Sequence, residues 1–538
     1  MPVARERPND HGVVYTPRDV CEPMVRRALE PLLATRRADE LVVCDPAIGE
    51  GAFLIEIVRV LADALGGGAR ARREVAARCL AGADIDARAV AAARDAVERF
   101  VGAPVPALRE RLRVGDALAL PWPRVDAIVG NPPYVRQERL GARKQPLRAY
   151  ASYDGVADLY VYFVELAHKI ARRGGRYCLV VPDKWLTAAY ARPLRAFLAR
   201  EGSVEGIVDF ARALPLFRDA DAFPCIVWGT VGGTPREPHA RRVTDATPVA
   251  AALAAPGIVH ARARWRAEPW HIDAPADAAV LDELARRWPA LGDVLPGKPS
   301  RGIVTGCNRA FVIDGDTRAR LLDAEPAAAA LIRPFVKGRD VRRWRPAALD
   351  RYILLVDRGT SLAHLPRLRA HLARFRDALE PRPPEHRGAW HGRKPGAYRW
   401  YELQDPVVPL ARSRAPRLLY QDIQTAPACC LDASGELVPD TTVWILPSDD
   451  RVLLAILNSP LYRWYARRRF PPALNGAVRP KLEYMRALPI ARPPPPLRAR
   501  IEALVAAQLV EPTAARDREL ARAVLDAYEL DAGDLSPG

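Results

Sequence analysis

"LVVCDPAIGEGAFL", residues 41–54, decides the fold of the amino-terminal part of this 538-residue chain. Residues 41–45 form a short apolar run typical of a buried strand, and "GAFLIEIVRVLADAL" (51–65) has the apolar spacing of a helix. Gly49 and Gly51 lie between the two. A glycine turn at this place lets the backbone approach a ligand at the helix N-terminus. The stretch therefore predicts a strand, a ligand-binding turn and a helix.

Strand-like and helical patterns alternate over the first 235 residues. A second helical pattern covers "ARAVAAARDAVERF" (87–100), whereas "GGGARARRE" (66–74) is predicted to be an exposed excursion. Apolar runs typical of further strands lie at 79–86, 125–130, 176–182, 204–210 and 224–230. The alternation predicts an α/β fold, with a Rossmann-like, doubly wound, mostly parallel sheet covered by helices on both faces.

The composition changes further along the chain. It becomes Pro-rich and polar from "GGTPREPHARRVTDATP" (232–248), which indicates the exit from the first domain. A mixture of short strands and loops extends to "ARPPPPLRAR" (491–500), and two helical patterns follow it. We predict an α/β domain at 1–235, a linker at 236–289, a mixed α+β domain at 290–495 and a C-terminal helical segment at 496–538.

Positive charge is concentrated in the second half of the chain. The formal net charge is +17, and only seven of the 81 basic residues are lysines. Residues 1–235 carry 34 basic and 29 acidic side chains, which leaves 47 and 35 for residues 236–538. Arginine suits bidentate contacts with phosphates and base edges, and the equal alternative in an Ala/Arg-rich chain is a GC-rich genome. A polyanionic partner would be attracted mainly to the second half of the chain.

The sequence favours an intracellular protein with reduced thiols. No run approaches the ~18–20 apolar residues of a membrane span, and "MPVARERPND" (1–10) lacks the apolar core of a signal peptide. Of eight cysteines, only Cys429 and Cys430 lie close together, and their spacing suits neither a zinc knuckle nor a redox motif. We expect a cytoplasmic protein without a metal or a membrane association.

Carboxylates follow two more of the predicted strands. Asp84 and Asp86 end the second strand, and Asp116 in "RVGDAL" (113–118) stands at a third such end. A carboxylate there can hold the two hydroxyls of a ribose, so the edge of the sheet predicts a nucleoside-containing cofactor. The third glycine of G-x-G-x-x-G and the Walker lysine are both missing, which disfavours a dinucleotide or a nucleoside triphosphate. The alternative for each residue alone is a tight turn or a helix cap.

"GNPPYVRQ" (130–137) follows the strand after Asp116, at the same predicted edge. With this motif the sequence resembles the adenine-N6 DNA methyltransferases of restriction-modification systems, in which a target-recognition domain follows the catalytic domain. The resemblance includes "VVYTPRDVCEPMV" (13–25), "DLYVYFVELA" (158–167) and "VVPDKWL" (180–186), and it continues through "RGIVTGCNRAFVID" (301–314), "PRLLYQDIQ" (416–424) and "LLAILNSPLYRWY" (453–465). It thus covers nearly the whole chain.

The resemblance implies S-adenosylmethionine as the cofactor. The chain departs from the class at Ile48 and Glu50, where a small or polar residue such as Cys or Ser is usual. The cofactor-binding residues that the resemblance implies are Tyr15, Thr16, Pro17, Asp45, Ala47, Gly49, Gly51, Asp84, Asp86, Asp116 and Asn131.

The motif's residue types suit methyl transfer to an exocyclic amine. The lone pair of adenine N6 is delocalised into the ring, and two hydrogen-bond acceptors, the Asn131 side-chain oxygen and the Pro132 carbonyl, would draw it back onto nitrogen. Pro132 and Pro133 stiffen the loop, and Tyr134 offers a stacking face to an extruded base. For the second face of the base pocket the resemblance implies an aromatic after the sixth strand, for which we choose Phe217 with Phe223 in reserve. The alternative for Tyr134 and Phe217 is a core aromatic.

The second half carries three basic clusters with interleaved aromatics, at 336–345, 386–403 and 461–470. They predict a groove for double-stranded DNA, and the alternative for each is a solvated basic face above core aromatics. No lysine has a Glu two positions before it, and about a dozen residues precede "VVYTP", so we expect no nuclease. A separate restriction endonuclease or defence-system subunits would then be partners.

Two other functions stay open. An Asn-Pro-Pro-Tyr methyltransferase can act on RNA or on a protein glutamine, although such enzymes usually add only a small module to the cofactor domain. A catalytically silent DNA-binding specificity subunit could keep the same fold. The intact motif and the full set of cofactor residues favour the adenine-specific DNA methyltransferase over both.

Overall fold

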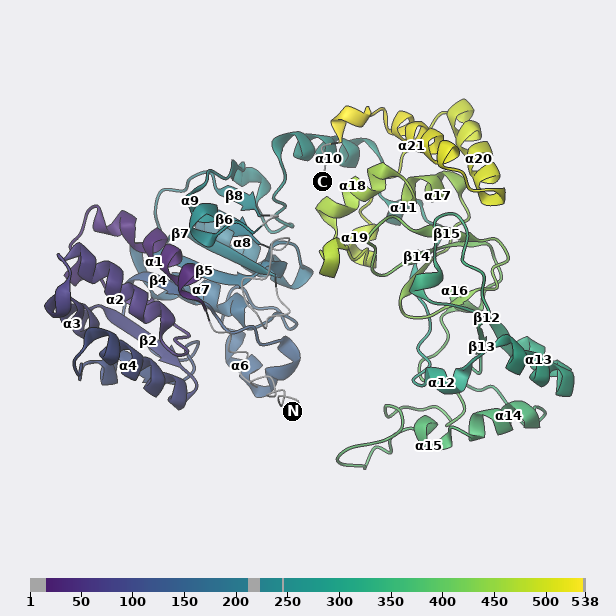
Figure 1. The fold of residues 1–538 in the computed structure, drawn as a ribbon, viewed down its shortest axis with the longest axis horizontal. Coiled ribbons are helices and arrows are strands. Elements are labelled where there is room, and N and C mark those ends of the chain that lie inside the picture. The colour runs from purple at the N-terminus through teal and green to yellow at the C-terminus, as the bar shows by residue number, and fades with distance from the viewer. Residues whose placement is uncertain (1–15, 211–222, 244–245, 536–538) are drawn as a thin grey trace. The chain divides into compact units, whose positions relative to one another are not determined.

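The computed structural model describes residues 16–210, 223–243 and 246–535. The chain divides into two compact units, Met1–Ile272 and Asp273–Gly538. Each unit has its own sheets and its own apolar core, so we describe them separately (Figure 1).

Within the described residues, the first unit contains a nine-stranded sheet with the order β3-β2-β1-β4-β5-β7-β6-β8-β9. Strands β3, β2, β1, β4 and β5 run parallel, and β7 runs antiparallel between β5 and β6. The strands are β1 (Val43–Asp45), β2 (Leu80–Asp84), β3 (Leu112–Val114), β4 (Val125–Gly130), β5 (Ala171–Pro182), β6 (Val204–Asp209), β7 (Pro224–Thr230), β8 (His239–Arg242) and β9 (Ile258–Val259). All six strands predicted from apolar runs are present, and the doubly wound, mostly parallel sheet is confirmed.

Two helical layers cover this sheet, one on each face, so its central strands are buried on both faces. Along β5, Cys178 and Val180 belong to one apolar core, whereas Tyr177, Leu179 and Val181 belong to the other. The alternation follows from the two-residue period of a strand. The first core contains α1 (Arg18–Leu33), α2 (Ala52–Ala64), α3 (Gly68–Arg78), α4 (Ala87–Val101) and α9 (Val249–Ala254), and the second contains α7 (Tyr160–Ile170) and α8 (Arg192–Glu201).

One local prediction was wrong. Residues 66–74, expected to be an exposed excursion, supply most of helix α3. Ala71 and Val75, one helical turn apart, are buried against the first core together with Ala76. This narrow apolar stripe is hidden among arginines in the sequence. The region 236–289, expected to be a linker, also contains β8 and β9, which continue the sheet beyond β6.

The second unit combines two small sheets with two groups of helices. Within the described residues, one four-stranded sheet has the order β10-β17-β14-β15 and the other β11-β13-β12-β16. Their strands are β10 (Ser300–Arg301), β11 (Val312–Ile313), β12 (Ile332–Val336), β13 (Tyr352–Leu354), β14 (Arg417–Gln421), β15 (Cys429–Asp432), β16 (Val438–Pro439) and β17 (Val443–Leu446). The predicted mixed α+β character of this region is confirmed.

Helices gather at opposite ends of the second unit (Figure 1). Helices α10 (Pro275–Arg287), α17 (Arg451–Leu457), α18 (Pro460–Arg469), α20 (Pro495–Val510) and α21 (Ala514–Tyr528) share one core, and the last two correspond to the predicted C-terminal helices. Helices α12 (Asn308–Phe311), α13 (Gly315–Ala324), α14 (Pro366–Ala373) and α15 (Arg376–Leu379) contribute to another core. No helix in the described parts of the chain has both the length and the apolar character to cross a bilayer.

Candidate functional site

The predicted site residues meet at one edge of the first unit's sheet. Strands β3, β2, β1 and β4 are neighbours in this order and run parallel, so their carboxyl ends share an edge. Asp45 and Asp84 are the last residues of β1 and β2, Asp116 follows β3, and Asn131 follows β4. Ligands of open α/β sheets bind at this edge.

The glycine turn after β1 has the strained backbone that only glycine adopts readily. Gly49 and Gly51 have φ angles of +48° and +90°. A Cβ atom on Gly51 would lie 3.1 Å from the Cα of Ala93, so the turn also packs tightly against α4. Ile48 points into the core and is 3% exposed, whereas Glu50 is exposed. The unusual isoleucine is thus a packing residue.

Asp45 is a buried carboxylate placed directly behind the Asn-Pro-Pro-Tyr loop. Its Oδ1 accepts a hydrogen bond from the Ala47 N–H at 3.0 Å, and its Oδ2 has no hydrogen-bond partner within the described residues. Burial, with a smaller contribution from Asp84, raises the pKa of Asp45 to about 7. A Cβ atom on Gly130 would lie 2.6 Å from Asp45 Oδ1, so the glycine before Asn131 is needed for this close approach.

Backbone N–H groups hold the two carboxylates after β2 in fixed orientations. Asp84 accepts hydrogen bonds from the N–H groups of Gly49 and Asp86, both at 3.0 Å, and thereby joins the glycine turn to the end of β2. Asp86 caps α4 by accepting from the Arg88 N–H at 2.8 Å. The alternative prediction of a turn anchor or a helix cap is therefore correct for Asp84 and Asp86. These hydrogen bonds still leave carboxylate lone pairs for a ligand.

Two residues that the sequence analysis did not single out also lie at this edge. Arg143, 12 residues beyond Asn131, donates two hydrogen bonds to Asp116 Oδ2, at 2.8 and 3.2 Å. Ile85, between the two acidic residues after β2, is 46% exposed, which is unusual for a large apolar side chain. An apolar residue flanked by two aspartates at a strand end was the signal available for Ile85, and the sequence carried no comparable signal for Arg143.

The Asn131 amide is oriented by the segment that precedes α1. Asn131 Nδ2 donates a hydrogen bond to Thr16 Oγ1 at 3.1 Å, and Thr16 is buried, 6% exposed. Asn131 Oδ1 is buried and has no hydrogen-bond partner in the described part of the chain. An unsatisfied buried acceptor costs ~1–3 kcal/mol, so this oxygen is set up to receive a donor from a ligand. Pro17 is the N-cap residue of α1, and Tyr15 lies outside the described residues.

Tyr134 is half-buried and fixed by packing. Its ring meets Tyr160 edge to face, with the ring centres 6.4 Å apart, and its Oη lies 3.5 Å from the Val180 carbonyl oxygen. Phe217, the predicted second aromatic, lies outside the described residues. Phe223 is half-buried and directly precedes β7, and its carbonyl accepts from the Asp183 N–H at 2.8 Å.

The residues present fit a cationic nucleoside cofactor. Two buried oxygens, Asp45 Oδ2 and Asn131 Oδ1, have no partner within the described residues, and oxygen acceptors of this kind suit a sulfonium and an ammonium group. Gly49 leaves room for close approach of a ligand to the backbone, because a Cβ atom there would meet no atom within 4 Å. Asp84, Asp86 and the exposed Ile85 offer carboxylate oxygens and an apolar face after β2, which are the groups that suit a ribose and a base.

The three basic clusters of the second unit differ in the structure. Trp344 and Trp464 are core residues, 3% and 5% exposed, so the alternative interpretation holds for the aromatics of the first and third clusters. Arg468 and Arg469 form ion pairs with Asp277 and Asp273, both at 2.8 Å. The middle cluster instead keeps partly exposed aromatics, including Trp390, Trp400 and Tyr401.

Comparisons with known proteins agree with this geometry. Residues 124–217 match the family described as Eco57I restriction-modification methylase. The chain is 29% identical to the Type II methyltransferase M.PaeR7I of Pseudomonas aeruginosa, over 73% of this chain and 70% of that protein. It is 24% identical to the Type II methyltransferase M.XhoI of Xanthomonas vasicola, over 97% and 98% of the two chains.

A solved structure shares the fold of most of the chain. The Type IIL restriction-modification enzyme MmeI in complex with DNA has a TM-score of 0.60 and 14% sequence identity, over 94% of this chain and 73% of that one. The family match covers β4, the Asn-Pro-Pro-Tyr loop, β5 and β6, and the glycine turn after β1 lies outside it. The chain thus contains a restriction-modification methylase domain and is similar over most of its length to Type II methyltransferases, and its cofactor is S-adenosylmethionine.

Proposed function

We propose that this methyltransferase modifies N6 of adenine within a specific sequence of double-stranded DNA, and that it does so without cleaving the DNA. The observation that carries the proposal is the buried Asn131 Oδ1, an acceptor without a partner in the described residues. It belongs to an Asn-Pro-Pro-Tyr loop at the ligand-binding edge of the sheet. An exocyclic amine is a donor of the kind that this oxygen lacks.

When bound, S-adenosylmethionine supplies the methyl group. The proposed cofactor residues are Asp45, Ala47, Gly49 and Gly51 in the turn, Asp84, Asp86 and Asp116 after the next two strands, and Tyr15, Thr16, Pro17 and Asn131. Among these, Thr16 and Asn131 are joined by a hydrogen bond, so the cofactor pocket and the amine pocket share a wall.

The chain's own residues prepare the amine for attack. Asn131 Oδ1 and the Pro132 carbonyl each accept one N6–H, which favours a pyramidal nitrogen with its lone pair directed away from the ring. Both acceptors are fixed before the substrate arrives, Asn131 by Thr16 and Pro132 by the two-proline backbone. Electrostatic preorganisation of this kind contributes ~3–4 kcal/mol per group in measured cases. The amide does not titrate, so the N6 proton passes to water.

The target base must leave the duplex to reach this loop. Tyr134 is held by Tyr160 and supplies a stacking surface, with Phe217 or Phe223 as the second aromatic. Stacking contributes ~1–3 kcal/mol per base, which offsets much of the few kcal/mol that flipping costs.

The decisive experiment expresses the protein in a bacterial host that lacks DNA methylation and sequences the genomic DNA with modified-base detection. N6-methyladenine in one recurring motif is expected, with intact chromosomal DNA. Methylated RNA or protein beside unmodified DNA would refute the proposed substrate, and cofactor binding without any transfer would indicate a silent specificity subunit.

A matched variant tests the role of the amide. Asn131→Ala is expected to lower methyl transfer by at least a hundredfold, which is far more than it weakens cofactor binding, while the melting temperature stays close to that of the wild type. Near-normal transfer of tritium to DNA by this variant would contradict the mechanism.

A further inference from the structure

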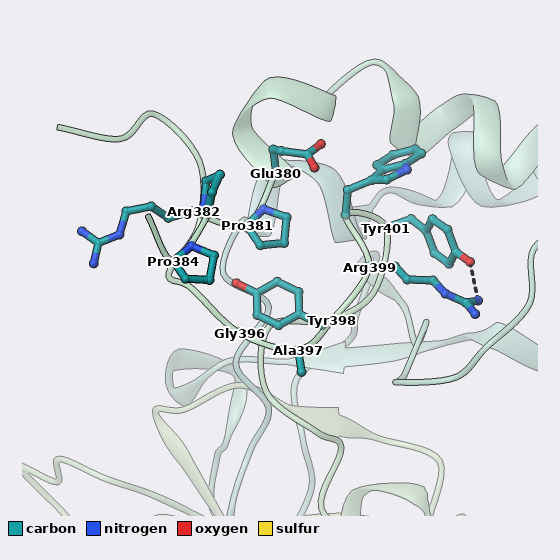
Figure 2. Close-up of a pocket in the computed structure, with 11 residues that line it drawn as sticks. Glu380, Pro381, Arg382, Pro384, Gly396, Ala397, Tyr398, Arg399 and Tyr401 are labelled. Carbon is teal, nitrogen blue, oxygen red and sulfur yellow. Dashed lines mark hydrogen bonds between the residues drawn. The ribbon is translucent and has the colours of Figure 1, made fainter. Parts of the chain in front are cut away.

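The middle basic cluster of the second unit surrounds a cavity of about 770 Å³ (Figure 2). The cavity is lined by three prolines and three aromatic residues together with Arg382 and Arg399. All of them belong to residues 380–384 and 396–401, the two ends of one segment. We call residues 381–401 the 381–401 loop. It contains neither a helix nor a strand. A loop of this length inside a compact domain is usually functional.

A buried arginine at its base gives the 381–401 loop one conformation. Arg393 is 3% exposed. Its guanidinium donates to the backbone carbonyls of Leu379 at 2.8 Å, Glu402 at 2.6 Å and Trp400 at 2.8 Å, and it lies over the Tyr398 ring at 4.6 Å. These contacts tie both ends of the loop to one side chain, so the cavity is preformed.

The exposed surface of the loop is cationic. Its basic residues are Arg382, Arg387, Arg393, Lys394 and Arg399, and its acidic residue is Glu385. Because Arg393 is enclosed by carbonyls, four cations and one carboxylate are exposed. Cations around an aromatic and proline wall are complementary to a nucleic acid, which offers phosphates and flat, partly apolar base and sugar edges.

The two arginines at the rim of the cavity are held differently. Arg399 Nη1 donates to Tyr401 Oη at 2.8 Å, and Arg399 Nε lies 4.0 Å from Glu402 Oε1. The Arg399 side chain is still 59% exposed, so an oriented guanidinium faces solvent. Arg382 extends away from the cavity on the opposite side (Figure 2). An oriented guanidinium can present two N–H groups to a guanine edge, whereas an extended one acts as a phosphate contact.

We propose that the 381–401 loop is a DNA-reading site, in which Arg399, positioned by Tyr401, recognises a guanine of the target sequence and Arg382 contacts a backbone phosphate. The aromatic and proline wall packs against the sugar and base edges between them. This inference rests on the proposed function and adds to it the residues that select the sequence.

The first test measures specificity. Arg399→Ala and Arg399→Lys are expressed in the methylation-free host, and the methylated motifs are read by modified-base sequencing. Both variants are expected to lose discrimination at one position that is guanine in the wild-type motif, by on the order of ten- to a hundredfold. Tyr401→Phe keeps the ring and removes the hydroxyl, so it is expected to relax the same position to a smaller extent.

The second test measures affinity for a fluorescein-labelled duplex by anisotropy over a range of salt concentrations. Arg382→Ala is expected to weaken binding equally for target and non-target duplexes and to reduce the slope of log K against log salt by about 0.9. The double variant R286A/R500A removes two exposed arginines that are already paired, with Glu283 and Glu519, and serves as the charge control. It is expected to bind as the wild type does.

Unchanged motifs with both Arg399 variants, or an unchanged salt slope with Arg382→Ala, would overturn the inference while leaving the proposed function intact. A wild-type chain that methylates no DNA would instead refute the proposed function, and the anisotropy test would still show whether the loop binds a duplex. A loop that binds RNA but not duplex DNA would also overturn the inference.

Discussion

Asn131 Nδ2 donates a hydrogen bond to Thr16 Oγ1 over 3.1 Å, across 115 residues of sequence. This bond uses the donor side of the amide and turns its oxygen into the buried space at the edge of the sheet. Thr16 is therefore a positioning residue for the proposed amine pocket, and its hydroxyl is the group that matters.

Thr16→Val tests this relationship with an isosteric side chain. We expect kcat to fall by about ten- to a hundredfold, because the amide loses its orientation, with a smaller change in KM for DNA. Thr16→Ser restores the hydroxyl and is expected to recover most of the activity. Steady-state methylation kinetics decide the point, and equal rates for the valine and serine variants would contradict it.

Gly130→Ala tests the close packing behind the catalytic loop. The added methyl would lie 2.6 Å from Asp45 Oδ1, so either the carboxylate or the loop must move. We expect a loss of ~1–3 kcal/mol in stability and a large loss of methyl transfer. Gly155→Ala is the matched control, since the nearest atom to its Cβ is at 4.0 Å. Thermal melting and methyl transfer, measured on both variants, would show no difference if the packing were unimportant.

The raised pKa of Asp45 predicts a pH dependence of stability. Between its unfolded value of 3.8 and its folded value of about 7, the folded protein binds more protons than the unfolded chain, so stability falls as the pH rises through this window. At about 1.4 kcal/mol per pKa unit the loss is on the order of 4 kcal/mol.

Asp45→Asn keeps an oxygen for the Ala47 N–H and removes the titration. The melting temperature of the wild type minus that of this variant is therefore expected to decrease as the pH is raised from 4.5 to 7.5. A constant difference between the two across this range would show that Asp45 is ionised in the fold.

Arg393→Met separates the scaffold of the 381–401 loop from its proposed DNA contacts. The substitution leaves several buried carbonyls without a donor, and we expect a loss of ~3–5 kcal/mol and a melting temperature lower by on the order of 10 °C. Arg382 is exposed, so the control variant Arg382→Met is expected to have the melting temperature of the wild type. Differential scanning calorimetry measures both melting temperatures. Equal values for the two variants would refute the structural role of Arg393.

Six strands of the sheet were predictable because each is an apolar run with a clear boundary, such as 125–130 before Asn131, whereas β8 (His239–Arg242) contains no apolar run and was not predicted. Helix α3 was not, because its stripe of Ala71, Val75 and Ala76 is too weak to stand out among arginines. Asp45, Asp84 and Asn131 could be found from the sequence because each lies at the end of a strand, and the carboxyl ends of parallel strands share one edge of the sheet.

Contacts between distant segments were beyond local patterns. The Asp116–Arg143 pair and the cavity around the 381–401 loop depend on tertiary packing, which no sequence periodicity encodes. The same holds for the aromatic clusters of the second unit, where Trp344 and Trp464 are buried and Trp400 is not.

The hydrogen bond from the Gly49 N–H to Asp84 makes the turn after β1 and the end of β2 a single mechanical part. A cofactor analogue with a bulkier group at either end would have to displace both together. Under the proposed assignment of the cofactor residues, attempts to engineer transfer of larger tags should therefore vary positions 49 and 84 as a pair, because a substitution at 84 removes the acceptor of the Gly49 N–H.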